Sequence, residues 1–297
     1  MTEPLSDLSH ALAAAVARIA PSVVRVKVHQ RHVSSGIALA PDLVVTTHHD
    51  LGRGGGDVRL LLEDGREATG SIFGRDPATD LALVRVPGAD LPVPTWHGTG
   101  DLAVGHLVLA LGRPTRTIRA LWGIVGGLDG PWESALGGRV DRYVDVDASL
   151  RWGFAGGPLV DARGRVVGVN SAALTRSGTT VPAETVQRVA ERLQARGGGA
   201  GGYLGVGATP VALPAAIAEA VGQEQAALVV SVAEASPAHA AGLLLGDTLV
   251  AIDGHPTRTV AEVAGVLAGQ APGDTVTLAV LRAGEIIELS ATLGARP

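Results

Sequence analysis

The sequence predicts a mainly β chain of two domains, and three observations support that prediction. Its 297 residues exceed the roughly 100–200 residues of one ordinary domain. Hydrophobic residues make up 46% of the chain and glycine fills 41 positions, which fits a compact protein with many turns. Short apolar or alternating runs are bounded by Gly, Pro and Asp, the usual pattern of an all-β domain. We therefore expect a larger β domain followed by a smaller domain.

The first expected element is a short helix over residues 7–20, an alanine-rich stretch that follows a candidate N-cap at Ser6 or Asp7. It forms an N-terminal helical segment, residues 1–20. From Pro21 onward the pattern changes to short apolar runs typical of strands. These runs stand at 23–30, 35–40, 43–47, 57–62, 81–86, 106–112 and 166–170.

A second helix is expected at 182–197, where it ends the first domain, residues 21–196. Its apolar residues recur at helical spacing, and Gly197 is the candidate C-terminal cap. They are Val186, Val189 and Leu193.

The segment 197–202, GGGAGG, has no side chain larger than methyl, so we expect a flexible linker there. The second domain is then 203–297, in which apolar runs alternate with helical stretches. Those stretches lie at 213–221, 237–242 and 259–269, and they predict a small mixed α/β domain.

Composition excludes several classes of function. The formal net charge is −5 and no cluster of Lys and Arg is present, so we expect no nucleic-acid partner. The absence of cysteine excludes disulfides, thiolate metal sites and a thiol nucleophile. Adjacent His48 and His49 point to opposite faces of an extended strand, and no HExxH pattern exists. We therefore expect neither a metal site nor a cofactor.

The N-terminus gives no sign of export, because it carries Glu3 and Asp7, and Arg18 interrupts its apolar stretch. No run approaches the roughly 20 apolar residues that span a bilayer, so we expect no direct membrane span. The compartment stays open: cytoplasmic for a complete chain, periplasmic or otherwise extracytoplasmic if a leader has been removed.

Three blocks of sequence carry the strongest functional signal. They are VVTTHHDL (44–51), DPATDLALVRV (76–86) and GFAGGPLVDARGRVVGVNSA (153–172). Together and in this order they resemble the signature blocks of the HtrA (DegP/DegS-like) branch of trypsin-like serine proteases. The resemblance implies two six-stranded antiparallel β-barrels with the site between them. It also implies a serine endopeptidase that acts on unfolded or misfolded proteins in protein quality control.

Within the first two blocks, the resemblance places the general base on His49 and the acid that orients it on Asp80. A base must be held in one tautomer by a carboxylate, so the two should lie together. Asp76 is the competing acid, but an Asx-turn at its Asp-Pro sequence explains it without a function.

In the third block, Ala155 stands where the resemblance expects the nucleophilic serine. The oxyanion loop would be Gly153, Phe154 and Ala155, with the Gly153 and Ala155 amides as donors. Glycine permits the tight turn that aims two N–H groups at one oxygen. Phe154 replaces the asparagine of many family members, and this does not affect a backbone role. Ala155 keeps its N–H and loses only the attacking oxygen, so we expect an inactive chain.

Two explanations of Ala155 remain open. It is either an engineered knock-out or the mark of a natural pseudoprotease that serves as a peptide-binding or chaperone module. The rest of the site matches the family pattern, and this favours the first explanation.

The resemblance also implies substrate-binding residues. One set lies on a strand whose edge would pair with substrate and wall the S1 pocket, and it comprises Val169, Asn170, Ser171 and Ala172. Thr179, in the segment 178–182, would face that set across the pocket. Neither segment carries a charge, so we expect small or medium aliphatic side chains at P1.

The start of the second domain resembles the carboxylate-binding loop of PDZ domains, whose amides capture the C-terminus of a peptide. This loop comprises Tyr203, Leu204, Gly205 and Val206. The segment 236–254 resembles the helix–turn–strand signature of the same family. The far wall of the groove would be a helix starting near Thr259, with Val260, Val263 and Val266 or Leu267 in the pocket.

We therefore expect unfolded proteins at the protease domain and C-terminal peptides at the PDZ domain as partners. A pure PDZ scaffold, in which the barrels only support assembly, is the rival function. Members of the family form homo-trimers through N-terminal segments, but this N-terminus lacks the aromatic residues such an interface needs. The oligomeric state stays open.

Overall fold

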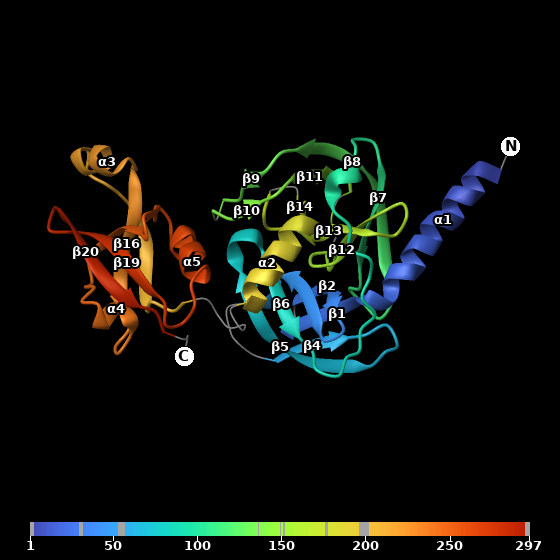
Figure 1. The fold of residues 1–297 in the computed structure, drawn as a ribbon, viewed down its shortest axis with the longest axis horizontal. Coiled ribbons are helices and arrows are strands. Elements are labelled where there is room, and N and C mark those ends of the chain that lie inside the picture. The colour runs from blue at the N-terminus through green and yellow to red at the C-terminus, as the bar shows by residue number, and fades with distance from the viewer. Residues whose placement is uncertain are drawn as a thin grey trace. The chain divides into compact units, whose positions relative to one another are not determined.

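The chain forms two compact units, Met1–Gly198 and Gly199–Pro297, in a computed structural model (Figure 1). The structure describes residues 3–29, 32–52, 57–135, 137–148, 150, 152–175, 178–195 and 202–294. The predicted linker at 197–202 and the predicted cap Gly197 lie outside these residues, apart from Gly202.

Helix α1 spans Glu3–Ile19 and projects from the first unit, with Ala15 and Ile19 buried at its base (Figure 1). It starts four residues earlier than expected, so Ser6 and Asp7 lie inside it and the predicted N-cap is wrong. Pro4 is tolerated there because the N–H groups of a first helical turn have no intrahelical partner. None of the helices in the described residues is long and apolar enough to cross a membrane.

The first sheet closes into a six-stranded antiparallel barrel in the order β1-β2-β3-β6-β5-β4. Its strands β3 and β6 are neighbours and consist almost entirely of buried residues, as expected for the centre of a core. The strands are β1 Val23–His29, β2 His32–Ala40, β3 Leu43–Thr47, β4 Asp57–Leu61, β5 Glu67–Asp76 and β6 Leu81–Arg85.

The second sheet has six strands in the order β11-β8-β7-β12-β13-β14. Its end strands are not joined by a backbone ladder among the described residues. Instead, the Thr179 hydroxyl donates to the Val144 carbonyl at 3.0 Å, which links β14 to β11. The second predicted barrel is therefore a curled sheet. The strands are β7 Leu107–Gly112, β8 Arg119–Asp129, β11 Tyr143–Val146, β12 Pro158–Asp161, β13 Val166–Ser171 and β14 Thr179–Pro182.

A small hairpin of β9 (Trp132–Glu133) and β10 (Arg139–Val140) supports the turn before β6. The Ser134 hydroxyl, in its loop, donates to the Ala78 carbonyl at 2.5 Å. A Cβ on Gly138 would lie 2.2 Å from the same carbonyl oxygen, so only glycine permits this approach. The hairpin thereby ties the second half of the unit to the first barrel.

Five strands fall outside the runs that the sequence predicts: β5, β8, β11, β12 and β14. In β8, for example, Gly123, Gly126 and Gly127 interrupt the apolar alternation, and most side chains are exposed or half-buried. Pairing with neighbouring strands, rather than a local pattern, makes these segments strands.

Helix α2, Ala183–Ala195, packs on the core as its apolar spacing predicts. Val186, Val189 and Leu193 are all buried, and the Leu193 side chain covers Gly74 of β5. The predicted helix that closes the first unit is confirmed over these residues.

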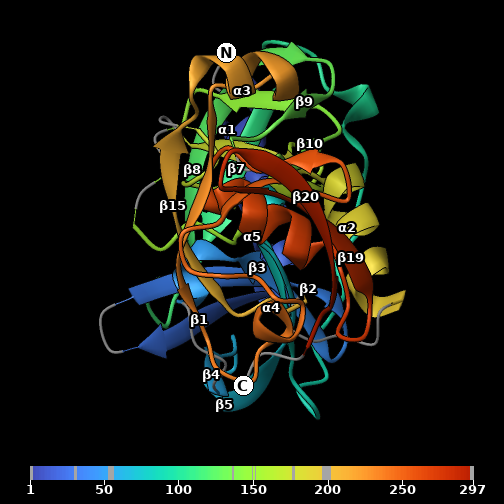
Figure 2. The same cartoon turned by 90° about the vertical axis from the view of Figure 1, so that its left-hand side faces the viewer.

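The second unit is a mixed α/β domain with the sheet order β15-β16-β17-β19-β20. Figure 2 faces this unit and shows α5 in front of the sheet, with β15 on one side and β19 on the other. β15 is an edge strand of this sheet. The strands are β15 Val206–Ala212, β16 Gln225–Val232, β17 Thr248–Ile252, β18 His255–Pro256, β19 Thr275–Arg282 and β20 Glu285–Thr292. The helices are α3 Ala215–Val221, α4 Pro237–Ala240 and α5 Val260–Ala268.

We predict that Leu111→Ala lowers the free energy of unfolding of the first unit by about 2–5 kcal/mol, because it leaves a cavity in the core. Leu111 is 0% exposed, whereas Leu5 on α1 is 76% exposed. The matched change Leu5→Ala should therefore alter the free energy by less than about 0.5 kcal/mol. Urea unfolding followed by tryptophan fluorescence measures this unit alone, because all 4 tryptophans precede residue 198. Equal losses for the two variants would contradict the assignment of the core.

Candidate active site

The register of β3 against β6 brings His49 and Asp80 together. Thr47 at the end of β3 pairs with Leu81 at the start of β6. His49 follows in the short 3-10 helix η2 (His49–Leu51), and Asp80 ends the 3-10 helix η3 (Pro77–Thr79) just before β6. The two side chains therefore extend from adjacent strand ends on the same side of the barrel.

The Asp80 carboxylate is the centre of a hydrogen-bond network. The Nδ1 atom of His49 lies 2.8 Å from Asp80 Oδ2, and the His49 backbone amide donates to Oδ1 at 3.0 Å. The Ser171 hydroxyl donates to Oδ2 at 2.6 Å from strand β13. Asp80 is only 3% exposed, and these donors compensate for the loss of water around its charge. This arrangement holds the imidazole in one orientation.

The backbone of Asp80 is left-handed, with φ 57°, which few residues other than glycine adopt. Its amide donates to the Pro77 carbonyl at 3.3 Å and its carbonyl accepts from the His48 amide at 3.0 Å. The turn is thus fixed from both sides, and it aims the carboxylate at His49.

Asp76, the competing acid, faces a different partner. Its carboxylate accepts from the Thr79 hydroxyl at 2.8 Å and from Arg192 of α2 at 2.6 Å. Of the two aspartates that the sequence leaves open, the structure therefore brings Asp80 to the His49 ring.

The two adjacent histidines have pKa values that shift in opposite directions. Burial lowers the pKa of His49, but the hydrogen bond from Asp80 and the charges of Asp80 and Asp50 outweigh it, so the pKa lies above 6.5. Burial, followed by the charge of Arg75, lowers the pKa of His48. The Arg75 guanidinium lies 3.3 Å from the Nδ1 atom of His48. His49 thus favours the charged form and His48 the neutral form.

Glycines in the GFAGGP segment are required by close approach of the backbone. Gly153 and Gly156 have φ values of 81° and 78°. A Cβ on Gly156 would lie 2.1 Å from the Ser35 carbonyl oxygen, and one on Gly157 would lie 2.1 Å from that of Leu111. The turn is therefore closed to any side chain at these positions.

Ser35 of β2 holds this loop with its backbone and its side chain. Its amide donates to the Ala155 carbonyl at 2.9 Å, and its buried hydroxyl donates to the Gly153 carbonyl at 2.6 Å. The Arg113 amide donates in turn to that hydroxyl at 2.7 Å. Within the described residues, the amides of Gly153 and Ala155 donate to no protein acceptor, which fits an oxyanion hole. Sequence reasoning missed Ser35 because its partners lie more than 100 residues away.

The three predicted loop residues differ in what they present. Ala155 is 8% exposed, and the Phe154 side chain is buried in an apolar cluster with Leu102 and Leu159. The ring of Phe154 anchors the loop, so its contribution beyond the backbone is packing.

The expected substrate-binding strand needs correction. Val169 pairs with Pro158 on one side and Val181 on the other, and its side chain lies in the core. The Asn170 amide donates to the Gly157 carbonyl at 2.8 Å, and the Asn170 carbonyl accepts from Gly156 at 2.8 Å. Neither backbone is therefore available to pair with substrate. The Ser171 side chain is committed to Asp80 rather than to a pocket.

Asn170 and Thr179 nevertheless line a common cavity beside the site. Its other lining residues are apolar or small: Ala110, Val146, Ala148, Leu150, Leu159, Gly178 and Thr180. The cavity measures about 10 Å³, roughly the space that one water molecule needs. Ala172, by contrast, is exposed beyond the end of β13. An uncharged lining of this kind agrees with the expected preference for aliphatic side chains.

In the second unit, the predicted carboxylate loop is only partly available. The Tyr203 amide donates to the Gly294 carbonyl at 2.9 Å, so it cannot also bind a ligand, and that part of the prediction is wrong. The amides of Leu204 and Gly205 donate to no acceptor in the part of the chain that the structure describes. Gly205 has φ 86°, and a Cβ there would lie 2.2 Å from that of Ser236. Val206 then starts the edge strand β15.

Helix α5 lies beside β15, but not all of its predicted residues face a groove. Val263 is 4% exposed and belongs to the core, so it is no pocket residue. Val266 and Leu267 are half-buried, as is Val206 on β15. Thr259 caps the helix by accepting from the Glu262 amide at 3.1 Å. The apolar wall next to the edge strand thus comes from Val266 and Leu267.

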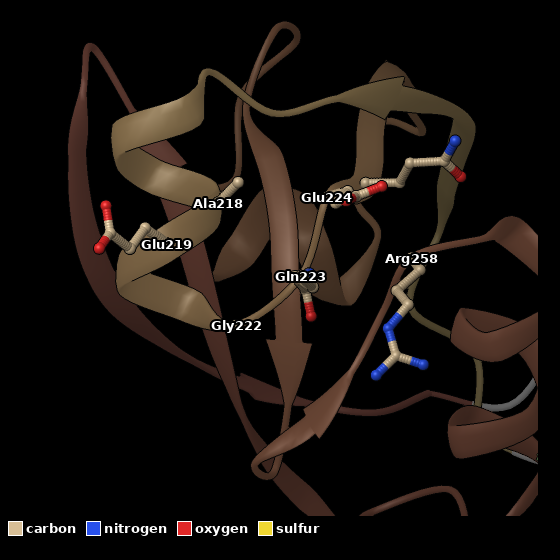
Figure 3. A pocket seen from close by; sticks show the side chains of 7 residues that line it. Ala218, Glu219, Gly222, Gln223, Glu224 and Arg258 are labelled. Atoms are coloured by element: carbon tan, nitrogen blue, oxygen red, sulfur yellow. The ribbon is translucent and has the colours of Figure 1, made fainter.

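The largest cavity lies away from both sites. It measures about 630 Å³ and is bounded by α3 and Arg258, with Glu219 and Glu224 in its lining (Figure 3). The described residues also contain no group of three or more His, Asp or Glu side chains placed to hold a metal ion.

Comparison with family models identifies both units. Residues 34–169 match the trypsin-like peptidase domain, and residues 202–293 match the PDZ domain.

Curated relatives match along most of the chain. A protein of Brucella suis biovar 1 named as a probable periplasmic serine endoprotease, DegP-like, is 30% identical over 284 residues, or 91% of this chain and 54% of the relative. A protein of the same name from Chlamydia trachomatis serovar D is 29% identical over 87% of this chain and 53% of the relative. The chain therefore spans about half the length of the curated relatives it matches.

Solved structures give the same picture over nearly whole chains. The HtrA-type protease AlgW with decapeptide is 26% identical, with a TM-score of 0.59 over 96% of this chain and 99% of that one. A serine endoprotease from Yersinia pestis is 25% identical, with a TM-score of 0.59 over 96% and 98%. Both resemble this chain in fold and in domain order.

We predict that Asp80→Asn lowers the pKa of His49, because it removes the hydrogen bond and the charge that favour the imidazolium. Asp76→Asn should leave that pKa unchanged, since its carboxylate binds Arg192. Proton NMR titration of the His49 ring, assigned with His49→Gln, measures both. Because the folded pKa is raised, the stability that His49 contributes is complete below pH 6.5 and is lost as pH rises through the folded value. A shift caused by Asp76→Asn alone would reverse the assignment of the two acids.

Proposed function

Because the chain belongs to the HtrA family, with a trypsin-like peptidase domain followed by a PDZ domain, we propose that its first unit carries a serine endopeptidase site in which Ala155 replaces the nucleophile. One observation carries this proposal. The Asp80–His49 pair lies in the same unit as a glycine loop whose Gly153 and Ala155 amides donate to no acceptor in the described residues.

The chemistry follows from these groups if a serine occupies position 155. The neutral His49 ring takes the hydroxyl proton on Nε2 while the oxygen attacks the peptide carbonyl. Asp80 keeps a proton on Nδ1 and stabilises the imidazolium that forms. The Gly153 and Ala155 amides stabilise the developing oxyanion, and His49 then gives its proton to the leaving amine. Water hydrolyses the acyl-enzyme by the same steps.

The chain as it stands lacks the attacking oxygen and should not cleave peptide bonds. The loop geometry depends on Ser35 and on glycines, not on the side chain at 155, so substrate binding is retained. We propose unfolded or misfolded proteins as the substrates, with small or medium aliphatic P1 residues, since the cavity lined by Leu150 and Val146 is uncharged. Protein quality control is the role that this substrate class implies.

For the second unit, we propose capture of peptide C-termini. The Leu204 and Gly205 amides offer donors for a terminal carboxylate. The edge strand β15 offers a ladder for the peptide backbone, and Val266 and Leu267 offer an apolar wall.

We predict that Ala155→Ser converts the chain into an endopeptidase that degrades casein, while the unchanged chain shows no cleavage. Loss of the nucleophile alone costs about 10⁶-fold in kcat in a well-studied serine protease, so restoring it should return most of that factor. The rate should rise with the deprotonation of an imidazole whose pKa lies above 6.5, since His49 must be neutral to accept a proton.

The control is His49→Ala in the Ala155→Ser chain, which should abolish cleavage again. If a folded Ala155→Ser protein binds peptide yet cleaves neither casein nor aliphatic-P1 peptides at any pH from about 6 to 9, the pseudoprotease alternative replaces this proposal.

We also predict that the full chain binds peptides ending in Val or Leu through their free carboxylate. Amidation should weaken binding about tenfold or more, since hydrogen bonds to a charged group contribute about 1.5–3 kcal/mol. Calorimetric titration with matched free-acid and amidated peptides measures this difference.

Val266→Asp should abolish binding by placing a carboxylate in the apolar wall. Val230→Asp, at a 48% exposed position of the same domain, is the matched control and should not change it. Equal affinities for the acid and the amide would remove carboxylate capture while leaving the PDZ fold.

A further inference from the structure

We propose that Asp50 is a positioning residue of this site. Its carboxylate faces the ring nitrogen of His49 that Asp80 does not bind, and it competes for that nitrogen with the atom at position 155. The consequence for catalysis rests on the proposed function, whereas the state of the His49 ring does not.

The geometry places one carboxylate at each ring nitrogen. Asp50 Oδ2 lies 3.5 Å from His49 Nε2, and Asp80 Oδ2 lies 2.8 Å from His49 Nδ1. The Thr47 hydroxyl donates to Asp50 Oδ2 at 2.8 Å and so fixes the carboxylate beside the ring. The Asp50 side chain is 16% exposed and that of His49 is 34% exposed, so water screens the pair only in part.

Hydrogen-bond chemistry makes this arrangement selective for one form of the ring. A neutral imidazole has one N–H, and its other nitrogen is an acceptor, while an ionised carboxylate only accepts. Both carboxylates are satisfied together only when both nitrogens carry protons. Asp50 therefore favours the imidazolium, and a general base needs the opposite, a free lone pair on Nε2.

The other titratable and charged groups around the ring do not reverse this preference. His48 is the neighbour in sequence, and the Arg75 guanidinium from β5 lies against His48. Asp76, also on β5, is paired with Arg192 of α2, and β13 contributes the neutral hydroxyl of Ser171. The net effect agrees with the raised pKa of His49.

The side chain at position 155 decides how much Asp50 matters. A methyl group there offers Nε2 no hydrogen bond, so in this chain Asp50 is the oxygen acceptor that faces Nε2. A serine hydroxyl would compete with Asp50 for the same nitrogen. Restored activity should therefore be weak at neutral pH and should increase when the Asp50 charge is removed.

The test follows the His49 ring in the full chain with ¹⁵N-labelled histidine, assigned by His49→Gln. Both ring nitrogens should be protonated below a midpoint that lies above pH 6.5. Asp50→Asn should shift that midpoint downward, and Asp50→Glu, which keeps the charge, should largely restore it. Asp64→Asn is the matched control, because Asp64 lies in the same barrel and pairs with Arg66. It should leave the midpoint unchanged.

An unchanged midpoint in Asp50→Asn would overturn the proposal. Asp50→Ser removes the same charge with a smaller side chain, and its titration decides the question if Asp50→Asn does not fold.

A second measurement compares Ala155→Ser with Ala155→Ser/Asp50→Asn in a pH profile of kcat/KM. The acid limb should move to lower pH, and each unit of that shift multiplies the active fraction below the limb by about ten. A limb that does not move would contradict the competition for Nε2. If the ring titrates as expected but neither variant cleaves casein, the proposed function fails and the role of Asp50 stands.

Discussion

The Asp80 carboxylate is the group on which the first unit's site depends, because it accepts hydrogen bonds from both sheets. His49 reaches it from the end of β3, and Ser171 reaches it from β13 in the second sheet. A buried charge without such partners would cost several kcal/mol, so the network fixes the relative position of the two sheets as well as the ring. The left-handed turn at Asp80 makes this meeting possible, and the β9–β10 hairpin supports that turn through Ser134.

The oxyanion loop shows why the side chain at 155 and the geometry of the site are independent. Ser35 binds the carbonyl groups of Gly153 and Ala155, and backbone crowding demands glycine at 156 and 157. None of these constraints involves the side chain of Ala155. Exchange between serine and alanine therefore changes the chemistry without changing the loop, which separates peptide binding from peptide cleavage.

The two units solve the problem of strand edges differently, and their binding properties follow. The first sheet closes on itself, and its site is made of side chains and turns at strand ends. The second sheet leaves β15 as an edge strand, which can accept a further strand. The Tyr203–Gly294 bonds anchor the start of that edge, while the Leu204 and Gly205 amides face no acceptor among the described residues. A peptide C-terminus supplies both a carboxylate and a strand.

The sequence by itself determined the fold class, the helix α2, and the candidates His49, Asp80 and Gly153–Ala155, because each rests on a local pattern or motif. It left Asp76 open and gave no sign of β8 or β12, whose pairing depends on neighbouring strands. Only the tertiary structure decided that Ser171 binds Asp80, that Ser35 holds the loop, and that Val169 and Val263 are core. It also placed Asp50 at His49 Nε2. These contacts depend on strand register and turn geometry, which bring together residues up to 118 positions apart, and no local pattern records that proximity.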